Sequence, residues 1–402
     1  MTIDAHVSSA PTTSDGDNRL HALDILRGLA LFFMILVHFH QRARAEATGA
    51  EDVIGWAVYI LVEQKSWGTF AFLFGVGFAV LLRRLEARGL PVVRIYLRRL
   101  AMLAVFGGIA HIAFGFHVLF DYACWGTVLL LVRRWSTPAL LAAASVAASI
   151  QPLVSEAMAL YAWWTSTAIP MPAGVALQRA VIVASQQPDY LTLLQARAAL
   201  FVYSLPHTWR HFLPDSNLAL FLIGLLAVRH RVIDEPLRHA RLIGAWMFFG
   251  AAGWATYWLG LRHLPSTGIP GADWPLRYGF GIVQDQWLCF TYVGAVLLLL
   301  ARRPWWNDRL IVFGSAGRLA LTNYLVQAAA LDFISSGYGL HLSVRPYFYL
   351  LATLGLFGVE AFASRLWLTH YRFGPLEWIW RSVTYARWQP LRATPPRTPV
   401  SV

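Results

Sequence analysis

The feature that most constrains this chain is a series of apolar runs long enough to cross a bilayer. A membrane-spanning helix needs about 20 predominantly apolar residues, and such runs recur along the 402 residues. Charged residues form only 13% of the sequence, against about 25% in soluble domains. An open sheet is excluded, because its unpaired backbone groups could not be satisfied in lipid. The sequence therefore predicts an all-α polytopic membrane protein.

Basic residues divide the span ends into two sides. Arginine pairs follow several apolar runs, and the connector 83–99 alone holds six arginines. Cytoplasmic loops carry an excess of Lys and Arg, so we predict a bundle of about ten transmembrane helices with both termini in the cytoplasm. The predicted spans are Leu23–Phe39, Trp67–Leu82, Leu100–Phe116, Val118–Val132, Pro138–Val154, Phe212–Val228, Leu242–Leu261, Phe280–Ala301, Leu310–Ile334 and Tyr347–Trp367.

The net charge of +12 has the same origin. Most of the 33 basic residues lie on the predicted inner side, which is the positive-inside bias of membrane proteins. The chain has no basic tail and no nucleic-acid motif. The positive charge therefore indicates that the partner is the lipid bilayer, and no nucleic-acid partner is expected.

The two ends of the chain differ in composition from the rest. Residues 1–18 are polar and acidic, and residues 389–402 contain four prolines, so we predict a disordered cytoplasmic lead-in and tail. Residues 19–388 are predicted to form one transmembrane helical domain. Within it, 155–211 is expected to be an outer segment with interfacial helices.

The first apolar run carries Asp24, Arg27 and His38. Charged groups inside a membrane usually face the bundle interior or a water-filled cavity and mark a functional path. Arg27 and His38 are 11 residues apart, so both lie on one helix face, roughly 16 Å from each other. Asp24 is close enough to pair with Arg27. The alternative is a membrane anchor with Asp24 and Arg27 at the lipid headgroups.

A second polar stretch, residues 314–327, enters a predicted span. Arg318 and Thr322 are spaced i, i+4, as are Asn323 and Gln327, so each pair shares a helix face. These side chains could form interhelical hydrogen bonds or line a cavity, and the sequence leaves both possibilities open.

A basic entrance on the cytoplasmic side is the third candidate feature. Arg318, Arg27 and the arginines of 83–99 would together suit a polyanionic ligand such as a phosphate-bearing cofactor. For the loop arginines, topology and lipid headgroups are the competing explanation. No metal-ligand spacing such as HExxH occurs, so no metal site is expected.

Glycines interrupt the aromatic stretch FAFLFGVGF at residues 70–78. Small residues let two helix backbones approach closely in a membrane. Gly75 and Gly77 are therefore predicted to serve helix packing.

Four blocks, in order, resemble the YeiB-like membrane proteins (domain of unknown function 418). They are RLHALDILRGLALFFMILVH, FAFLFGVGF, GRLALTNYLVQ and FGPLEWIWRSVTY, spread between residues 19 and 385. That family is similar to a wider superfamily of transmembrane acyltransferases, including acyltransferase family 3 and heparan glucosaminide N-acetyltransferase. The link is an Arg and a His on the first helix, here Arg27 and His38.

The resemblance implies a multi-pass protein of the bacterial inner membrane. It implies transfer of an acyl group from cytoplasmic acyl-CoA, in particular acetyl-CoA, to an extracytoplasmic envelope or carbohydrate acceptor. His38 would be the general base or would carry the acyl group, and Arg27 with Asp24 would stabilise the thioester side or hold the pantetheine arm. The candidate cofactor contacts are Arg318, Asn323, Thr322 and Gln327.

One block departs from the relatives. They carry Asp-Ile-Leu-x-x-Tyr-Ala after the third span, whereas this chain has His117 in place of the Asp and Asp121 one helical turn later. If that Asp orients a catalytic base in the relatives, either Asp121 does so here, beside His117, or the function has drifted.

Two other classes of function remain open alongside the acyltransferase. The intramembrane charges could form the relay of a transporter for a small anion or envelope precursor. The protein could also be a non-catalytic membrane assembly or signalling protein. Binding of acyl-CoA would separate the first class from the other two, and substrate flux without a cofactor would favour the transporter.

Overall fold

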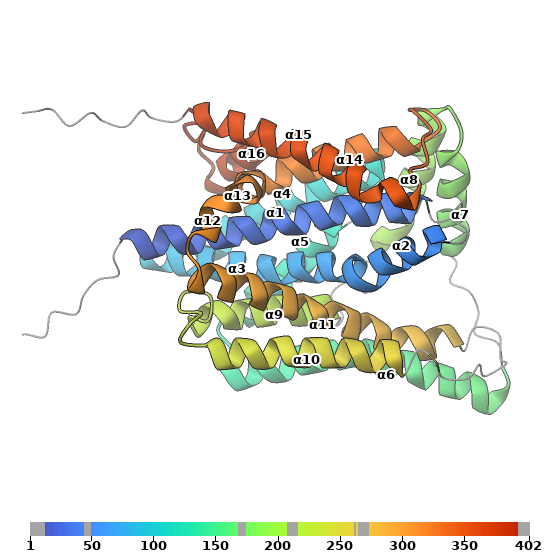
Figure 1. Ribbon diagram of the computed structural model, residues 1–402, viewed down its shortest axis with the longest axis horizontal. Helices are drawn as coiled ribbons and strands as arrows, with labels where there is room; N and C mark the ends of the chain where they lie inside the picture. The colour runs from blue at the N-terminus through green and yellow to red at the C-terminus, as the bar shows by residue number, and fades with distance from the viewer. Residues whose placement is uncertain are drawn as a thin grey trace, which may run out of the picture.

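The computed structural model is a bundle of long helices that run side by side (Figure 1). It describes residues 13–43, 50–116, 118–167, 174–206, 216–260, 263 and 273–392. The elements are α1 Thr13–Ala43, α2 Ala50–Val58, η1 Tyr59–Glu63, α3 Gln64–Ala87, α4 Val92–Phe114, α5 Val118–Val132, α6 Thr137–Thr165, α7 Gly174–Ser185, α8 Tyr190–Ser204, α9 Ser216–Arg229, α10 Ala240–Leu259, α11 Asp273–Arg302, α12 Trp306–Arg309, α13 Ile311–Arg318, α14 Ala320–Ser335, η4 Pro346–Phe348, α15 Tyr349–His370 and α16 Pro375–Tyr385.

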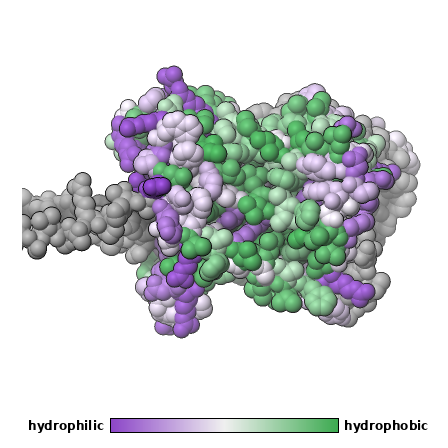
Figure 2. Space-filling view, turned by 90° about the horizontal axis from the view of Figure 1, so that it is seen from above, coloured by the Kyte–Doolittle hydropathy of each residue, from purple (hydrophilic) through white to green (hydrophobic). Residues whose placement is uncertain are grey.

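The described helices have the dimensions and surface of a membrane bundle. On the face seen in Figure 2, hydrophobic side chains cover the middle of the bundle and hydrophilic ones gather towards the two ends. Five described helical runs are long and apolar enough to cross a membrane: His21–Arg42, Val53–Ala87, Val92–Phe114, Thr137–Thr165 and Pro346–His370. The chain is thus an all-helical integral membrane protein. The count of about ten spans and the side on which the termini lie stay predictions.

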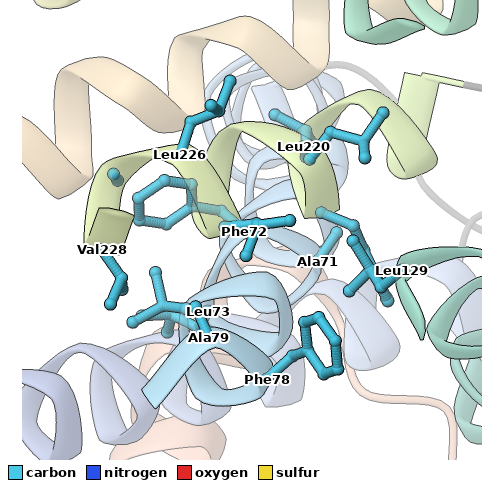
Figure 3. Packing of buried hydrophobic residues seen from close by; sticks show 14 of the residues in the cluster. Ala71, Phe72, Leu73, Phe78, Ala79, Leu129, Leu220, Leu226 and Val228 are labelled. Carbon is cyan, nitrogen blue, oxygen red and sulfur yellow. The ribbon is translucent and has the colours of Figure 1, made fainter. Parts of the chain in front are cut away.

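Helices α3 and α9 meet in the largest hydrophobic core cluster. Phe72 of α3 is buried together with Leu220 and Leu226 of α9 (Figure 3). Their backbones touch, because a Cβ on Gly75 would collide with the carbonyl oxygen of Phe221. The predicted packing role of Gly75 is therefore confirmed. An added Cβ on Gly77 would meet only the Arg27 guanidinium, 3.9 Å away.

Helix α13 lies across α1 in an equally close contact. A Cβ on Gly28 would overlap the Phe313 carbonyl, and one on Gly317 would overlap the Asp24 carbonyl. Only residues without a Cβ permit this approach. The contact holds the start of α1 and the end of α13 together.

The helices are irregular at two places, one within a predicted span and one just before another. The predicted span Leu310–Ile334 is broken at Leu319, where α13 ends and α14 begins. The apolar residues before α3 join it through the π-helix η1. A π-helix departs from the regular i→i+4 hydrogen-bonding pattern. Here the Ile60 carbonyl accepts a hydrogen bond from Trp254 Nε1 at 3.1 Å, and the Leu61 carbonyl accepts one from the Tyr292 hydroxyl at 2.7 Å.

The predicted outer segment 155–211 is helical over most of its described part. Helix α6 continues to Thr165, and α7 and α8 then pack against each other. Residues 168–173 and 207–215 lie outside the described residues.

The predicted terminal extensions are described only in part. Residues 1–12 and 393–402 lie outside the description, and α1 already begins at Thr13. At the other end, the Gln389 carbonyl accepts from Trp378 Nε1 at 2.7 Å. The first residues of the predicted tail therefore lie against α16.

Candidate functional site

A cavity of about 510 Å³ lies among α1, α3, α4, α5, α13, α14 and α16. It lies toward the end of the bundle where α1 begins and α3 ends. Its volume is within the range of about 300–1,000 Å³ typical of small-molecule sites.

Arginines dominate the polar lining. Among the described residues, seven arginines and two carboxylates line the cavity. Such an excess of positive charge between low-dielectric walls concentrates anions, and guanidinium groups bind phosphate in a bidentate manner. The arginines are Arg27, Arg84, Arg88, Arg99, Arg318, Arg372 and Arg381, and the carboxylates are Asp24 and Glu377.

The crossing of α1 and α13 places Arg27 and Arg318 in this one cavity. Gly28 and Gly317, each adjacent in sequence to one of these arginines, make the crossing contact. Arg27 Nη1 donates to Asp24 Oδ1 at 2.7 Å, and both side chains remain partly exposed, at 31% and 18%. The predicted ion pair is therefore present, and it faces the cavity.

Helix α16 packs against α4 and supplies Arg381 to the basic lining. The Arg99 guanidinium lies 3.6 Å from the centroid of the Trp380 ring, and Trp380 Nε1 donates to the Arg99 carbonyl at 2.8 Å. Arg381 stacks at 4.4 Å over Phe373, and burial lowers its pKa. No site role was predicted for this block from the sequence, although Arg372 and Arg381 each stand next to aromatic residues.

Glu377 connects α16 to the break between α13 and α14. Its Oε1 accepts from the amides of Leu321 and Thr322 at 2.7 and 3.0 Å, and its Oε2 accepts from the Thr322 hydroxyl at 2.5 Å. Burial raises the pKa of this carboxyl, and the Thr322 donors act in the opposite direction. Thr322 thus holds the helix start in place rather than lining the cavity.

Asn323 and Gln327 also bond within the protein. Asn323 Nδ2 donates to the Ala316 carbonyl at 3.0 Å and to Ser364 Oγ at 2.9 Å. Gln327 Nε2 donates to Glu360 Oε2 at 2.7 Å. Both side chains join α14 to α15, so interhelical hydrogen bonds are the arrangement observed. Of the four candidate cofactor contacts, Arg318 is the one that lines the cavity.

His38 lies beyond the inner end of the cavity. The innermost lining residue of α1 is Met34, one helical turn before His38. The His38 ring is buried, and it contacts the edge of the Phe116 ring at 4.3 Å between centroids. The structure therefore brings Asp24, Arg27 and Arg318 together, and it places His38 one helical turn beyond Met34, at the far end of the cavity from these three residues.

The two residues of the departing block are described unequally. Asp121 is buried in the first turn of α5, next to the cavity-lining Tyr122. His117 lies outside the described residues.

A buried polar group at the π-helix was not predicted from the sequence. Glu63 Oε2 lies 3.9 Å from His40 Nε2, and Glu63 Oε1 accepts from Gln41 Nε2 at 2.9 Å. Lys65 is only 1% exposed. The available signal was the polar run Glu63-Gln64-Lys65 between two apolar stretches. In the described part of the chain, no group of three or more His, Cys, Asp or Glu side chains could hold a metal ion.

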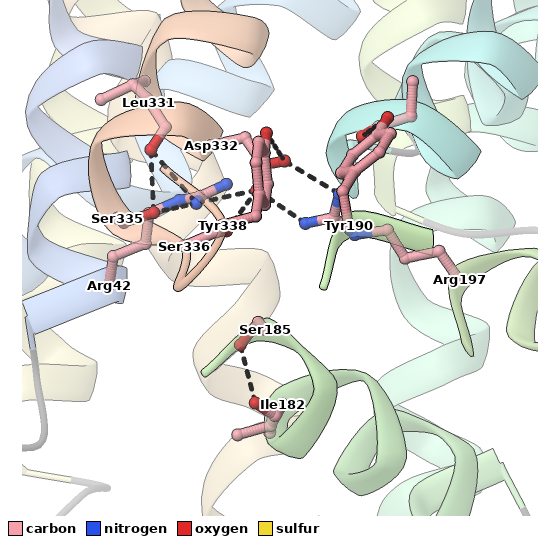
Figure 4. Close-up of polar contacts among 11 residues, drawn as sticks. Arg42, Ile182, Ser185, Tyr190, Arg197, Leu331, Asp332, Ser335, Ser336 and Tyr338 are labelled. Carbon is pink, nitrogen blue, oxygen red and sulfur yellow. Dashed lines mark hydrogen bonds and ion pairs between the residues drawn. The ribbon is translucent and has the colours of Figure 1, made fainter. Parts of the chain in front are cut away.

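A second group of charges, at the C-terminal end of α1 and away from the cavity, was also not predicted (Figure 4). Asp332 is fully buried and accepts two bonds from Arg197, at 2.9 and 2.6 Å. It also accepts from Arg42 at 3.3 Å and from the hydroxyls of Ser336 and Tyr338 at 3.0 Å. This Asp332 cluster joins α1, α8 and α14.

Two family models match the chain. The model described as Protein of unknown function (DUF418) matches residues 227–387. The model described as Heparan-alpha-glucosaminide N-acetyltransferase, catalytic, matches residues 19–181, which include α1 and the α3, α4 and α5 walls of the cavity. No solved structure gives a significant match.

Full-length relatives are similar over nearly the whole chain. YxaH of Bacillus subtilis is 30% identical, and the alignment covers 96% of this chain and 98% of YxaH. YeiB of Escherichia coli is 24% identical, with 90% and 95% covered. The expected resemblance is thus confirmed, and the chain belongs to the DUF418 family of YeiB-like membrane proteins.

Proposed function

We propose that this protein is a membrane acyltransferase that takes its acyl group from acyl-CoA bound in the arginine-lined cavity. The observation that carries the proposal is the presence of Arg27 and Arg318 in one cavity with five further arginines. The match of residues 19–181 to the catalytic model of an N-acetyltransferase supports it.

The cavity offers the two kinds of surface that an acyl-CoA requires. Its arginines can neutralise the phosphates of the nucleotide end. Further inside, its walls are aromatic and aliphatic, with Phe70, Phe74, Leu119 and Tyr122. Such walls suit the pantetheine arm and the acyl group, which carry no charge.

His38 is the proposed general base. The acceptor O–H or N–H bond breaks, its proton moves to the imidazole, and the acceptor atom bonds to the thioester carbonyl carbon. The C–S bond then breaks, and CoA leaves as the thiolate, which takes up the proton. Met34 and Phe116 separate His38 from the cavity, so the step requires these side chains to move. A placed base contributes roughly 10²–10⁴-fold in rate.

The proposal includes a direction across the membrane. With about ten spans and cytoplasmic termini, as the arginine distribution predicts, the cavity would open to the cytoplasm of a bacterial inner membrane. The donor would enter there, and an envelope or carbohydrate acceptor would approach His38 from the other side.

The direct test is binding of acetyl-CoA to the full-length protein in lipid nanodiscs. Arg318→Ala removes one charged contact, which contributes about 1.5–3 kcal/mol, so affinity should fall roughly 10- to 100-fold. His38→Ala should leave binding unchanged. Arg309→Ala is the matched control, because Arg309 stacks on Trp305 at 4.3 Å and does not line the cavity. Well-folded protein that binds no acyl-CoA would refute the proposal.

Transport of a small anion is a second candidate, with one observation in its favour. The break at Leu319 interrupts a predicted span beside the cavity, and interrupted helices often form transporter sites. Uptake of a labelled anion such as phosphate or pyrophosphate into proteoliposomes, without acyl-CoA, would support this candidate. Acyl-CoA binding without any anion flux would exclude it.

A further inference from the structure

The inner end of the cavity is formed by a small set of residues from four helices. On each helix they are the lining residues farthest from the arginines: Met34 of α1, Phe70 of α3, Val118 of α5 and Tyr324 of α14. Met34 is seven residues from Arg27, which corresponds to about 10 Å along the helix axis. A ligand anchored at the arginines therefore reaches this end with its uncharged portion.

Tyr324 is the polar member of that set. Its side chain is 5% exposed, and its hydroxyl has no hydrogen-bond partner among the described residues. An unpaired buried hydroxyl costs free energy and needs an explanation. The neighbouring polar residues of α14 are satisfied, since Asn323 and Gln327 bond to Ser364 and Glu360.

Tyr324 is also placed near the predicted base. Its ring lies 6.3 Å from that of Phe116, and the Phe116 ring lies 4.3 Å from that of His38. One aromatic side chain thus separates the hydroxyl-bearing ring from the imidazole. A carbonyl group at the inner end of the cavity would therefore lie beside the Tyr324 hydroxyl, and Phe116 would have to move for His38 to reach the same group.

We propose that the Tyr324 hydroxyl donates a hydrogen bond to the carbonyl oxygen of the acyl thioester. This inference rests on the proposed function and adds a catalytic residue to it. The donor polarises the carbonyl in the bound state and stabilises the negative charge that develops on its oxygen when the acceptor attacks. The hydroxyl keeps its proton throughout, so the bonds made and broken are those of the transfer step described above.

The test uses acetyl-CoA labelled with ¹³C at the carbonyl and the full-length protein in nanodiscs. Isotope-edited infrared spectroscopy reports the carbonyl stretch, which a hydrogen bond moves to lower frequency. Wild-type protein should show this shift, and Tyr324→Phe should abolish it. Tyr96→Phe is the matched control, because Tyr96 also lines the cavity with an unpartnered buried hydroxyl but lies one helical turn into α4, near Arg99.

Affinities give a second readout. Net hydrogen bonds contribute about 0.5–1.5 kcal/mol, so wild-type protein should bind acetyl-CoA about fivefold more tightly than CoA. Tyr324→Phe should remove this preference while leaving the affinity for CoA unchanged. Once the acceptor is known, the same variant should reduce the transfer rate about 10²–10³-fold.

The outcomes separate this inference from the proposed function. Acetyl-CoA binding with the same carbonyl frequency in wild type and Tyr324→Phe would overturn the role of Tyr324 and leave the acyltransferase proposal standing. No binding of acetyl-CoA or CoA by folded wild-type protein would overturn both. Loss of the shift in Tyr96→Phe as well would assign the effect to general packing and also refute the inference.

Discussion

The cavity and the Asp332 cluster both gather arginines along α1, but they balance the charge differently. In the cavity, seven arginines among the described residues face two carboxylates. In the Asp332 cluster, one fully buried carboxylate accepts bonds from Arg42, Arg197 and two hydroxyls. The number of arginines is thus a poor guide to a ligand site, and the supply of acceptors within the protein is a better one.

The charged groups of the Asp332 cluster are already paired within the protein, so the cluster is poorly suited to bind a ligand. Arg197 is 4% exposed, and it also donates to the Ala113 carbonyl at 2.8 Å. Buried charges are tolerated when they are paired and hydrogen-bonded. The cluster therefore fastens α8 to the ends of α1 and α14, whereas the cavity retains positive charge that an anion can neutralise.

The largest expected effect comes from breaking the cluster. Asp332→Ala leaves two arginines without their buried partner, and loss of one member of a buried pair costs about 3–5 kcal/mol. We expect a clear fall in the thermal unfolding temperature of the protein in detergent.

A surface pair provides the control for this prediction. Asp234 accepts from Arg83 at 3.0 Å, with side chains 20% and 44% exposed, and exposed pairs contribute about 0–1 kcal/mol. Asp234→Ala should therefore barely change the unfolding temperature. Equal losses in the two variants would contradict the structural role of the Asp332 cluster.

Salt should have a moderate effect on anion binding in the cavity and no effect on the stability contributed by the Asp332 cluster. Raising the ionic strength from 0.05 to 0.5 M shortens the Debye length well below 10 Å. Binding of inorganic pyrophosphate to the cavity should then weaken about tenfold. The stability difference between wild type and Asp332→Ala should stay constant, because that pair is buried. Salt-independent pyrophosphate binding would argue against the arginine site.

The smallest effect concerns the start of α8, which carries Arg197. The Thr192 hydroxyl and the Leu191 amide donate to Asp189 and hold the pKa of its carboxyl below the usual value. Because the folded-state pKa is lowered, this contribution is complete above about pH 4 and is lost as the pH falls through the lowered pKa. Hydrogen exchange in residues 190–204 should show less protection at pH 3 than at pH 6, after correction for intrinsic rates.

Asp189→Ala supplies the comparison for this pH dependence. The variant should show reduced protection at the start of α8 at both pH values. A wild-type loss of protection that persists unchanged in Asp189→Ala would assign the effect to other groups.

Much of the fold was accessible from the sequence because lipid imposes strong rules. Apolar runs predicted the long helices, and Gly75 predicted a close helix contact. The break at Leu319 was not visible, because no proline or glycine occupies that position and the interruption depends on Glu377, 58 residues later. The π-helix escaped notice for a similar reason, since side chains of α10 and α11 bond its carbonyls.

The sequence predicted which charged residues belong to the site, but not the direction in which the polar side chains of α14 point. Arg27 and Arg318 were expected to share an entrance and Asp24 to pair with Arg27, and all three line one cavity. Asn323 and Gln327 have the same polar character, yet they bond towards α15. The rotation of a helix about its axis depends on its neighbours, and the polar residues of α14 occupy more than one face, so they give little periodic signal of which face is inward. The contribution of α16 depends on tertiary contacts such as that between Trp380 and Arg99.

The glycine crossing of α1 and α13 has a mechanical consequence. Gly28 and Gly317 allow the two backbones to lie in contact. We therefore expect Arg27 and Arg318 to stay fixed relative to each other, as one rigid wall of the cavity. We therefore expect a large anion to enter or leave by movement of the opposite wall, α16. This helix is held by Glu377 and by the contact of Trp380 with Arg99. The cavity entrance is therefore expected to have one fixed wall and one movable wall.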